Sequence, residues 1–384
     1  WCPRCATGIS QHEIVTEGYR ELTHASVTVR FPIRGRENES LLVWTTTPWT
    51  LTSNVAAAVG PDLTYVKVRH DDHVLYLSKG ALSILKGPFE VLDQMMGTEL
   101  AGLTYDGPFD ELEAQQQLGG PQAHQVILWK DVGEEEGTGI VHIAPGCGAE
   151  DFELGKEHGF PAIAPLDEEG EFVEGFGSFT GTHVSDSPQR VFESLRQKDI
   201  LYKVEDYTHR YPVCWRCSTE LVFRLVDEWF ISMDELRHDM MDVTRQIRWI
   251  PSFGLDRELD WLKNMHDWMI SKKRYWGLAL PIWECEACGH FEVIGDEHEL
   301  GKRAVAGWDA FEGHTPHRPW IDQVRIACSE CGEEVKRIPD VGNPWLDAGI
   351  VSFSTLRYRT DRDYWTRWYP ADWISESFPG QFRN

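Results

Sequence analysis

The sequence predicts a mixed α/β protein that is rich in β-strands and carries a long inserted domain. Two observations lead to this fold class: short segments in which apolar and polar residues alternate, and nine cysteines of which eight fall into four C-x-x-C pairs. The 384 residues, 41% of them hydrophobic, are enough for two or three packed domains.

Strands dominate the first half of the chain. Val27, Val29 and Phe31 alternate with polar residues, and Tyr65 to Val68 do so less cleanly. The segments "HVLYL" and "QVILW" follow, each short and apolar. A period of two residues is typical of strands with one buried face, so these four segments are predicted strands.

Two segments are predicted to be helices. "SDSPQRVFESLRQ" offers a Ser/Asp cap, Pro188 in the first turn, and Val191 and Leu195 on one face. "LDRELDWLKNMHDWMIS" repeats apolar residues at helical spacing and is predicted to be a core-facing helix. Its apolar positions are Leu255, Leu259, Leu262 and Met269.

The paired cysteines have the spacing of a metal site. The pairs are Cys2/Cys5, Cys214/Cys217, Cys285/Cys288 and Cys328/Cys331. Each pair puts two thiolates on one tight knuckle, and two knuckles complete a tetrahedral zinc site. Redox dithiols are the alternative, but this pattern in a reducing compartment usually binds zinc.

The spacing also predicts which knuckles combine. The last two lie about 40 residues apart, a loop that a local ribbon can close. The first two are then left to meet across about 200 residues, which is a whole domain. We therefore expect five segments: residues 1–22 and 206–280 as the two halves of one ribbon, 23–205 as the insertion, 281–340 as a second zinc-binding knob, and 341–384 as part of a further domain.

Composition excludes some classes of protein. A formal net charge of −25 argues against a general nucleic-acid coating protein, because phosphate binding rests on Lys and Arg. No apolar stretch approaches the roughly 20 residues of a membrane span, and the first residues do not resemble a signal peptide. The chain is interpreted as an internal piece of a longer polypeptide, with a cytoplasmic location.

Five motifs together resemble one family. "WTTTPWTLTSN", "GTGIVHIAPGCGAED", "CWRCST", "KKRYWGLALPIW" and "WLDAG…WISE" are similar to isoleucyl-tRNA synthetase and follow its order. The resemblance implies a β-barrel-like editing domain inserted in the Rossmann-type catalytic domain of a class I synthetase. The valyl and leucyl enzymes, which carry an arginine in the threonine stretch, remain the alternative.

The threonine stretch is predicted to form one wall of an editing site. Thr45, Thr46 and Thr47 follow the strand "LLVW", where side chains can project into a pocket. The resemblance implies that Trp44, Thr50 and Asn54 bind the substrate beside them. Without the resemblance, three threonines are equally well explained as β-branched strand residues.

The second wall is predicted from "GTGIVHIAPGCGAED". Its pattern indicates a strand with His142, a loop, and a helix that begins near Ala149. Asp151 in the first turn should stay ionised near the helix dipole, and the resemblance implies that it holds the α-ammonium of the substrate. His142 would limit pocket size; alternatively it is a hydrogen-bonded core residue. Gly137 and Thr138 are further substrate-binding candidates.

Three alternatives stay open at this point. Cys147 and His142 could form a Cys/His hydrolase, although a small residue filling a tight loop is the simpler interpretation. A zinc hydrolase would need an open coordination position, which two all-thiolate sites do not provide. The third alternative is a non-catalytic zinc-ribbon module that binds RNA.

The C-terminal part is predicted to approach the aminoacyl pocket. The resemblance implies that Trp345, Asp347, Glu376 and Gln381 bind substrate there. ATP and Mg²⁺ belong to the full-length enzyme only, because the sequence contains neither an H-x-G-H nor a K-M-S-K-S stretch. The implied partners are the aminoacylated 3′ end of tRNA(Ile), with valine and isoleucine as aminoacyl groups, and the expected state is a monomer that does not bind membranes.

Overall fold

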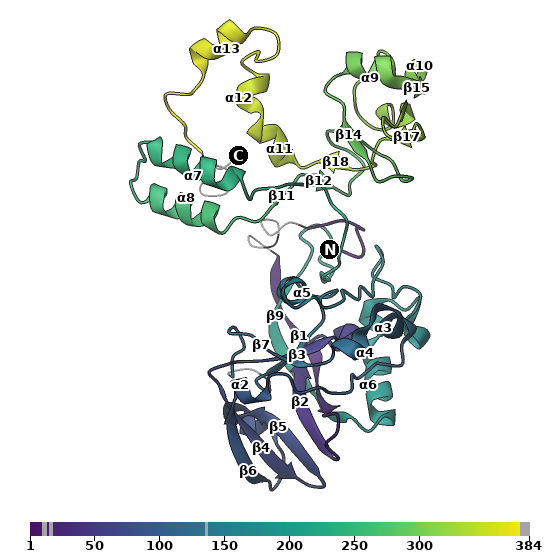
Figure 1. The fold of residues 1–384 in the computed structure, drawn as a ribbon, viewed down its shortest axis with the longest axis vertical. Coiled ribbons are helices and arrows are strands. Elements are labelled where there is room, and N and C mark those ends of the chain that lie inside the picture. Colours follow the sequence, from purple (N-terminus) through teal and green to yellow (C-terminus); the bar gives the residue numbers. More distant parts are fainter. Residues whose placement is uncertain (10–13, 15–17, 135–136, 377–384) are drawn as a thin grey trace. The chain divides into compact units, whose positions relative to one another are not determined.

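The computed structural model describes residues 1–9, 14, 18–134 and 137–376. The chain divides into two compact units, Trp1–Val226 (unit 1) and Asp227–Asn384 (unit 2). Figure 1 shows that unit 1 holds the large sheet, whereas unit 2 combines helices with short strand pairs. No helix in the described part of the chain is both long and apolar enough to span a bilayer.

Two sheets form the framework of unit 1. A six-stranded sheet has the order β6-β4-β5-β2-β1-β9, and a three-stranded sheet has the order β7-β3-β8. The strands are β1 (Tyr19–Pro32), β2 (Glu39–Thr45), β3 (Ala56–Val59), β4 (Thr64–His70), β5 (His73–Ser78), β6 (Glu90–Met96), β7 (Val126–Leu128), β8 (Ile140–Ile143) and β9 (Leu201–Pro212). All four segments predicted to be strands are confirmed.

The long antiparallel ladder between β1 and β9 joins the two ends of the insertion. It runs from the pair Tyr19/Pro212 to the pair Val29/Leu201, with an irregularity at Thr28. Figure 1 shows these strands as an extended ribbon that reaches from the N-terminal segment to the sheet. The predicted domain limits at residues 23 and 205 therefore fall inside paired strands.

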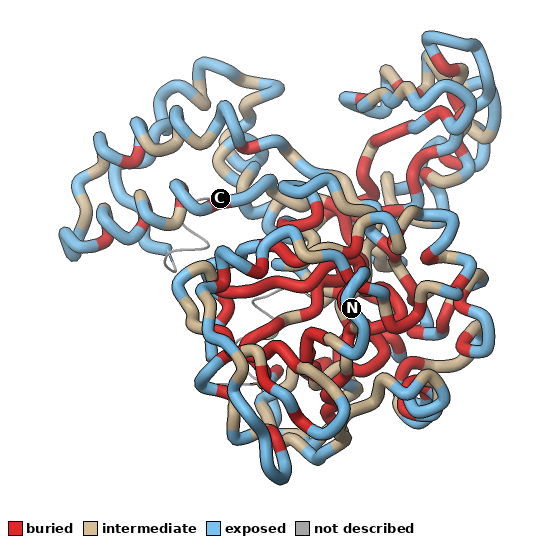
Figure 2. Tube along the Cα trace, turned by 60° about the horizontal axis from the view of Figure 1, so that its bottom comes forward, coloured by how far each residue is buried: buried red, intermediate tan, exposed pale blue. Residues whose placement is uncertain are grey.

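The core of unit 1 lies between its strands and helices. Val27, Val29 and Phe31 are fully buried, as their alternation predicts, and Phe31 stacks on Tyr105 with 5.1 Å between ring centroids. Figure 2 shows buried residues concentrated in the interior, with exposed residues at the periphery. Burial of one strand face on this scale is the main favourable contribution to folding.

Short helices connect the strands of unit 1. These are α2 (Gly97–Leu100), α3 (Glu113–Leu118), α4 (Gly120–Ala123), α5 (Ala149–His158) and α6 (Pro188–Gln197), with the 3₁₀ helices η1 (Pro48–Ser53), η2 (Lys79–Ile84), η3 (Gly177–Phe179) and η4 (Val184–Asp186). In α6, Val191 and Leu195 are buried as predicted. Ser187 occupies the N-cap position, within the predicted Ser/Asp cap, but its hydroxyl donates to the carbonyl of Val184 (2.7 Å) and accepts no hydrogen bond from the helix N–H groups.

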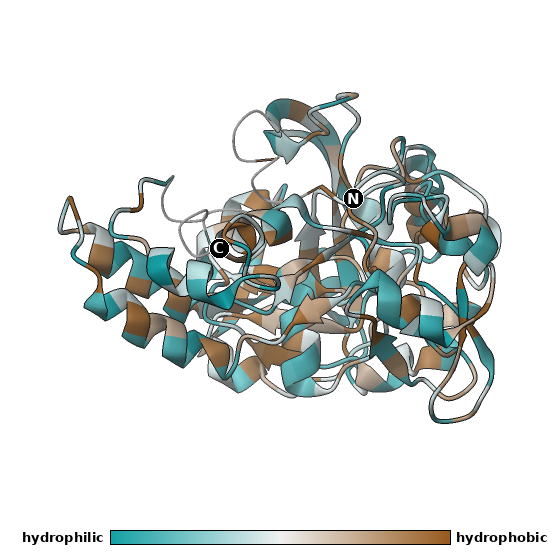
Figure 3. Cartoon of the chain, turned by 90° about the horizontal axis from the view of Figure 1, so that it is seen from above, coloured by the Kyte–Doolittle hydropathy of each residue, from teal (hydrophilic) through white to brown (hydrophobic). Residues whose placement is uncertain are grey.

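Unit 2 consists of helices and short strand pairs. Its helices are α7 (Leu236–Gln246), α8 (Gly254–Lys263), α9 (Glu297–Arg303), α10 (Trp308–Phe311), η5 (Ile321–Gln323), α11 (Pro344–Gly349), α12 (Val351–Ser354) and α13 (Arg362–Trp368). Its strands are β10 (Phe230–Ile231), β11 (Trp268–Met269), β12 (Ser271–Lys272), β13 (Ile282–Glu284), β14 (Phe291–Val293), β15 (Ala304–Ala306), β16 (Arg325–Ala327), β17 (Glu334–Lys336) and β18 (Val341–Gly342). Figure 3 shows hydrophobic and hydrophilic residues alternating along helices. Leu262 of α8 and Leu300 of α9 are buried, whereas α11, α12 and α13 have no buried residue.

The helix predicted over residues 255–271 is shorter than its apolar pattern suggests. α8 ends at Lys263, where the Asn264 amide turns back to donate to the carbonyl of Asp260 (2.8 Å). Met269 therefore lies outside the helix and pairs with Phe230 in a two-stranded ladder. The Asn264 side chain caps α8 before the apolar pattern ends. Apolar spacing alone therefore could not show that the last residues of the pattern form a strand.

Glu39, at the start of β2, generates a prediction on stability. Its carboxylate accepts hydrogen bonds from Lys67 (2.7 Å) and Tyr76 (2.6 Å), and Arg36 lies 3.5 Å away. Burial by itself raises the pKa of Glu39, but these partners outweigh burial and hold the pKa below its ordinary value.

We expect Glu39→Gln to destabilise unit 1 by about 1.5–3 kcal/mol at pH 7, the range for hydrogen bonds to a charged group. A lowered folded-state pKa gives stability that is present above the unfolded pKa and is lost as the pH falls through the folded pKa. The difference between wild type and variant should therefore shrink between pH 5 and pH 3. Thermal unfolding at several pH values measures it, and a difference independent of pH would contradict this role.

Candidate functional site

The three threonines end β2 and enter η1 through a row of hydrogen-bonded hydroxyls. Thr45 Oγ1 accepts from the backbone N–H of Thr47 (3.1 Å) and lies 3.2 Å from Thr47 Oγ1. Thr47 Oγ1 in turn lies 3.4 Å from Thr50 Oγ1. Thr46 is half-buried, and its hydroxyl takes no part in this row. The row thus connects a strand end to the first turn of η1.

His142, on β8, closes the row. Its Nε2 lies 2.9 Å from Thr50 Oγ1, and Thr50 Oγ1 itself donates to the carbonyl of Thr47 (2.8 Å). Because the single hydroxyl hydrogen of Thr50 is used in that way, Nε2 must be the donor to Thr50. Burial lowers the pKa of His142 to about 4. The ring is therefore neutral at pH 7, with its proton on Nε2.

The loop after β8 carries Asp151 and Cys147. Asp151 lies in the first turn of α5, as predicted, and its carboxylate covers Gly148, where an added Cβ would lie 2.2 Å from Oδ2. Burial and the charge of Glu150 raise the pKa of Asp151 to about 7, although the N–H of Ala144 lowers it. The expectation that Asp151 stays ionised is thereby corrected: loss of solvation outweighs the helix dipole.

Cys147 has the properties of a packing residue. It belongs to the buried core of unit 1. Burial raises the pKa of its thiol far above the ordinary range, although Ser53 acts in the opposite direction. A thiol in this state is not a nucleophile at neutral pH, which disfavours the Cys/His hydrolase.

Trp44 packs beside the threonines. Its ring covers Gly137, where an added Cβ would lie 2.5 Å from Cε3, and it contacts Tyr207 edge-to-face at 5.1 Å. Gly137 has φ +66°, a left-handed conformation that favours glycine. Thr138 is buried, and its hydroxyl donates to the carbonyl of Ile140 (3.3 Å). Roles of Trp44, Gly137 and Thr138 in binding stay predictions.

Asn54 is enclosed by partners that the sequence did not reveal. Its Oδ1 accepts from Tyr105 (2.8 Å) and its Nδ2 donates to the carbonyl of Ala56 (2.9 Å). Gln115 and His124 contact the same backbone segment. Glutamines in "DELEAQQQL" look like the residues of a solvated helix, so no local signal marked Gln115. A direct contact of Asn54 with substrate stays a prediction.

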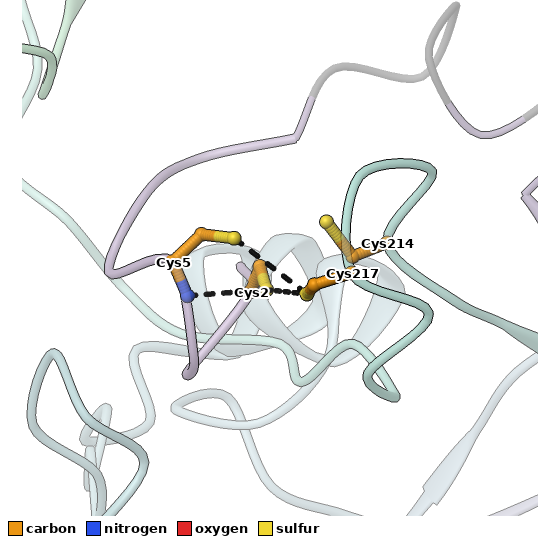
Figure 4. A group of neighbouring side chains, drawn as sticks. All are labelled: Cys2, Cys5, Cys214 and Cys217. Carbon is orange, nitrogen blue, oxygen red and sulfur yellow. Dashed lines mark hydrogen bonds between the residues drawn. The ribbon is translucent and has the colours of Figure 1, made fainter.

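The first group of four cysteines contains two cysteines from each end of the insertion. Figure 4 shows Cys2 and Cys5 on one segment facing Cys214 and Cys217 on another. Cys217 Sγ lies 3.5 Å from Cys2 Sγ and 3.6 Å from Cys5 Sγ, and all four sulfurs lie within 4.8 Å of one another. These separations are too long for disulfides and place four ligands around one point.

The second group lies in unit 2 and confirms the pairing of the other two knuckles. Cys285 Sγ lies 3.5 Å from Cys331 Sγ, and Cys288 Sγ lies 3.7 Å from Cys328 Sγ. Cys285 and Cys328 are buried, whereas the other two are exposed. Both groups could hold a metal ion.

Three of the four predicted aminoacyl-pocket residues lie in the described part of the chain, and all three are exposed. Trp345 and Asp347 lie on the exposed helix α11, where Asn343 caps the N–H of Trp345 (3.1 Å). Glu376 is also exposed. Gln381 lies outside the described residues. Their assignment stays a prediction.

A cavity of about 410 Å³ lies beside α3. Glu113, Gln117, Ile163, Glu174 and Phe176 are among the residues that line it. None of its lining residues is a predicted site residue, so the cavity is a separate feature of unit 1.

Known proteins match the chain over nearly its whole length. It is 40% identical over 378 residues to the isoleucine–tRNA ligase of Methanothermobacter marburgensis, covering 98% of this chain and 35% of that protein. The isoleucine–tRNA ligase of Thermus thermophilus is 40% identical over 385 residues, with 98% and 36% covered. The chain thus spans about a third of the length of these relatives.

Two solved structures resemble part of the chain. The crystal structure of GlLeuRS-CP1 has a TM-score of 0.37 and 14% identity, covering 48% of this chain and all of that one. The editing domain of the P. knowlesi cytosolic leucyl-tRNA synthetase has a TM-score of 0.35 and 11% identity, covering 48% and 98%. A family model described as tRNA synthetases class I (I, L, M and V) matches residues 1–382. Because that model spans almost the entire chain, the protein belongs to the class I tRNA synthetase family.

Proposed function

We propose that the chain contains the editing part of an isoleucine-specific synthetase, which hydrolyses the valyl ester of mischarged tRNA(Ile). One observation carries this proposal: a row of threonine hydroxyls ends on a neutral, buried imidazole, and the nearby thiol is not activated. The names of the relatives support isoleucine as the cognate amino acid. The two sheets of unit 1 would form the barrel-like editing domain, and the last segment would belong to a Rossmann-type catalytic domain.

Such a site suits an ester that is already activated. Hydrolysis of an aminoacyl ester needs an oriented water, a polarised carbonyl and a fixed substrate, and no covalent intermediate. Thr50 donates its only hydroxyl hydrogen to the carbonyl of Thr47. The hydroxyl of Thr46, which lies outside the row, is then the donor left to polarise the ester carbonyl or hold the water, and Thr47 can do so only by turning its hydrogen away from Thr50.

Editing is needed because binding alone discriminates weakly. One methylene in an apolar pocket is worth ~1–3 kcal/mol, an estimate for which isoleucyl-tRNA synthetase is itself the standard example. A site that admits isoleucine therefore also admits valine, and a second site must remove the product. In this proposal His142 and the threonines line a pocket that is large enough for valine but too small for isoleucine.

Asp151 would hold the α-ammonium of the esterified amino acid. Its pKa of about 7 means that carboxylic acid and carboxylate coexist at neutral pH before substrate binds. A bound ammonium lowers that pKa and favours the carboxylate, since opposite charges stabilise each other. Asp151 would thus be fully ionised only when it forms an ion pair with the α-ammonium of the substrate.

The two cysteine groups would each hold one structural zinc ion. A tetrahedral zinc with Zn–S bonds of about 2.3 Å separates its sulfurs by about 3.8 Å. The sulfur separations of 3.5–3.7 Å fit that geometry. Four thiolates leave no open position, so the metal would stabilise each knuckle and take no part in hydrolysis.

The whole protein would ligate isoleucine to tRNA(Ile) with ATP and Mg²⁺, as a cytoplasmic monomer. The present chain would contact chiefly the aminoacylated 3′ end. Both statements rest on the family and on the names of relatives that are about three times longer than this chain.

A deacylation assay tests the function directly. The chain should release valine from Val-tRNA(Ile) at least about tenfold faster than isoleucine from Ile-tRNA(Ile), since the pocket difference of ~1–3 kcal/mol sets that scale. His142→Ala should enlarge the pocket and raise the rate with Ile-tRNA(Ile). If wild type released both amino acids at equal rates, or released neither, the proposal would be wrong. Release of a leucine analogue from another tRNA would favour the leucyl alternative, and release of threonine would favour the valyl alternative.

Asp151→Ala should slow deacylation of Val-tRNA(Ile) about ten- to a hundredfold, because a charge-assisted hydrogen bond worth ~1.5–3 kcal/mol is lost. In wild type, kcat/KM should rise with pH through about 7, as the carboxylate form grows. The variant should lack that rise. An N-acetylated valyl ester has no ammonium and should be cleaved at similar rates by both proteins.

The matched control is Glu150→Gln, which removes the neighbouring exposed carboxylate on the same turn. Because Glu150 raises the pKa of Asp151, this variant should stay active and shift the pH profile to lower values. If Asp151→Ala slowed the acetylated and free esters equally, the residue would be structural.

Metal analysis should find two zinc ions per chain. Cys2→Ser or Cys214→Ser should reduce the count to one, because each removes a ligand from the group that closes the insertion. Cys147→Ser is the control and should keep both ions. Elemental analysis of the purified proteins measures this, and a count of zero or four in wild type would contradict the assignment.

A further inference from the structure

Three buried side chains from residues 105–124 hold the segment that follows η1. Gln115 Nε2 donates to the carbonyls of Thr52 (2.9 Å) and Asn54 (3.0 Å). Tyr105 and His124 contact the same segment, through the side chain of Asn54 (2.8 Å) and the carbonyl of Val55 (3.1 Å). All three side chains come from residues that are at most 1% exposed. This segment directly follows the turn that carries Thr50.

His124 links this segment to Asp110. Its Nδ1 faces the Val55 carbonyl, and its Nε2 lies 2.6 Å from Asp110 Oδ1. Each ring nitrogen therefore faces an acceptor oxygen, and the ring connects the Val55 carbonyl to the Asp110 carboxyl. Tyr105 stacks on the ring, with centroids 4.9 Å apart.

The chain leaves room for this pair. At Gly107 an added Cβ would lie 2.2 Å from His124 Nε2 and 2.3 Å from Asp110 Oδ1. The Gly107 N–H also donates to Asp110 Oδ2 (2.9 Å), and Arg34 approaches the same oxygen at 3.9 Å. His124, the Gly107 N–H and Arg34 therefore hold the carboxyl group of Asp110 in place.

Val55 transmits this contact to the strand of His142. Its carbonyl accepts from His124, while its N–H donates to the carbonyl of Ile143 on β8 (2.9 Å). Further along the same ladder Ala57 is registered opposite His142. One residue, Val55, thus lies between the Asp110–His124 pair and the strand from which His142 reaches Thr50.

We propose that Asp110 and His124 are positioning residues for the hydroxyl site. They fix the peptide of Val55, and with it the alignment of η1 and β8 across which Thr50 meets the imidazole of His142. The proposal rests on the proposed hydrolytic function of that site. Neither residue touches the reacting atoms.

The test compares His124→Gln and Asp110→Asn with wild type, well below the melting temperature of each protein. Both variants should lower kcat for Val-tRNA(Ile) about 10- to 100-fold with KM little changed, because misplacement by about 1 Å has that effect on rate. His70→Gln is the matched control: His70 is also buried and bonded to a backbone carbonyl, that of Lys86 (2.7 Å), elsewhere in unit 1. Its kcat should equal that of wild type.

A second measurement separates positioning from folding. NMR titration of ¹³C-labelled histidines, assigned with His142→Ala, follows the pKa of His142, which burial holds at about 4. In both variants that pKa should move up toward the ordinary value, because a loosened segment admits water. Tyr105→Phe, which removes one hydrogen bond only, replaces any variant that fails to fold and should shift the titration in the same direction.

The outcomes are distinct. An unchanged His142 titration together with a kcat like that of His70→Gln would overturn the proposal and leave the pair a purely structural role. If wild type hydrolyses no ester, the proposed function fails, but the titration still decides whether the pair controls the surroundings of His142.

Discussion

The pairing of β1 with β9 is the constraint on which the rest of unit 1 depends. This ladder joins residues that are about 170–195 positions apart in the chain, from Tyr19/Pro212 to Val29/Leu201. Closing a loop of that length costs conformational entropy, which a long ladder and the four-cysteine group beyond it offset together. Once both ends are held, β1 aligns β2, and the threonine row that leads from the end of β2 into η1 brings Thr50 to His142 on β8.

Burial decides the chemistry of the site more than charge does. The imidazole of His142 stays neutral because it is desolvated, and the Asp151 carboxyl has its pKa raised to about 7 for the same main reason. The formal charge of −25 is carried by the chain as a whole and does not set the character of this pocket. In the proposed reaction such a site would act through oriented hydroxyls, and substrate binding would complete the ionisation of Asp151.

Much of this arrangement could be predicted from local patterns. The alternation at Val27 to Phe31 marked β1, and cysteine spacing predicted both four-sulfur groups correctly. The strand, loop and helix around His142 and Asp151 also follow from a contiguous motif. These features share one property: the residues that determine them are neighbours in sequence or have a fixed chemical spacing.

The features that the sequence did not predict depend on residues that are distant in the chain. Met269 fitted the helical period but pairs with Phe230, a residue outside the helix pattern. The helix dipole was a sound reason to expect an ionised Asp151, but its burial depends on the whole loop. Tyr105, Gln115 and His124 support the segment after η1 from about 50–70 residues away, and nothing in their local sequence indicates it.

The most direct measurement is a crystal structure of the chain with a non-hydrolysable analogue of the 3′-terminal adenosine that carries valine in amide linkage. The account predicts the amide oxygen within hydrogen-bond distance of the Thr46 or Thr47 hydroxyl, and the α-ammonium beside Asp151. An analogue bound instead in the 410 Å³ cavity beside α3, or with its ammonium remote from Asp151, would contradict the account.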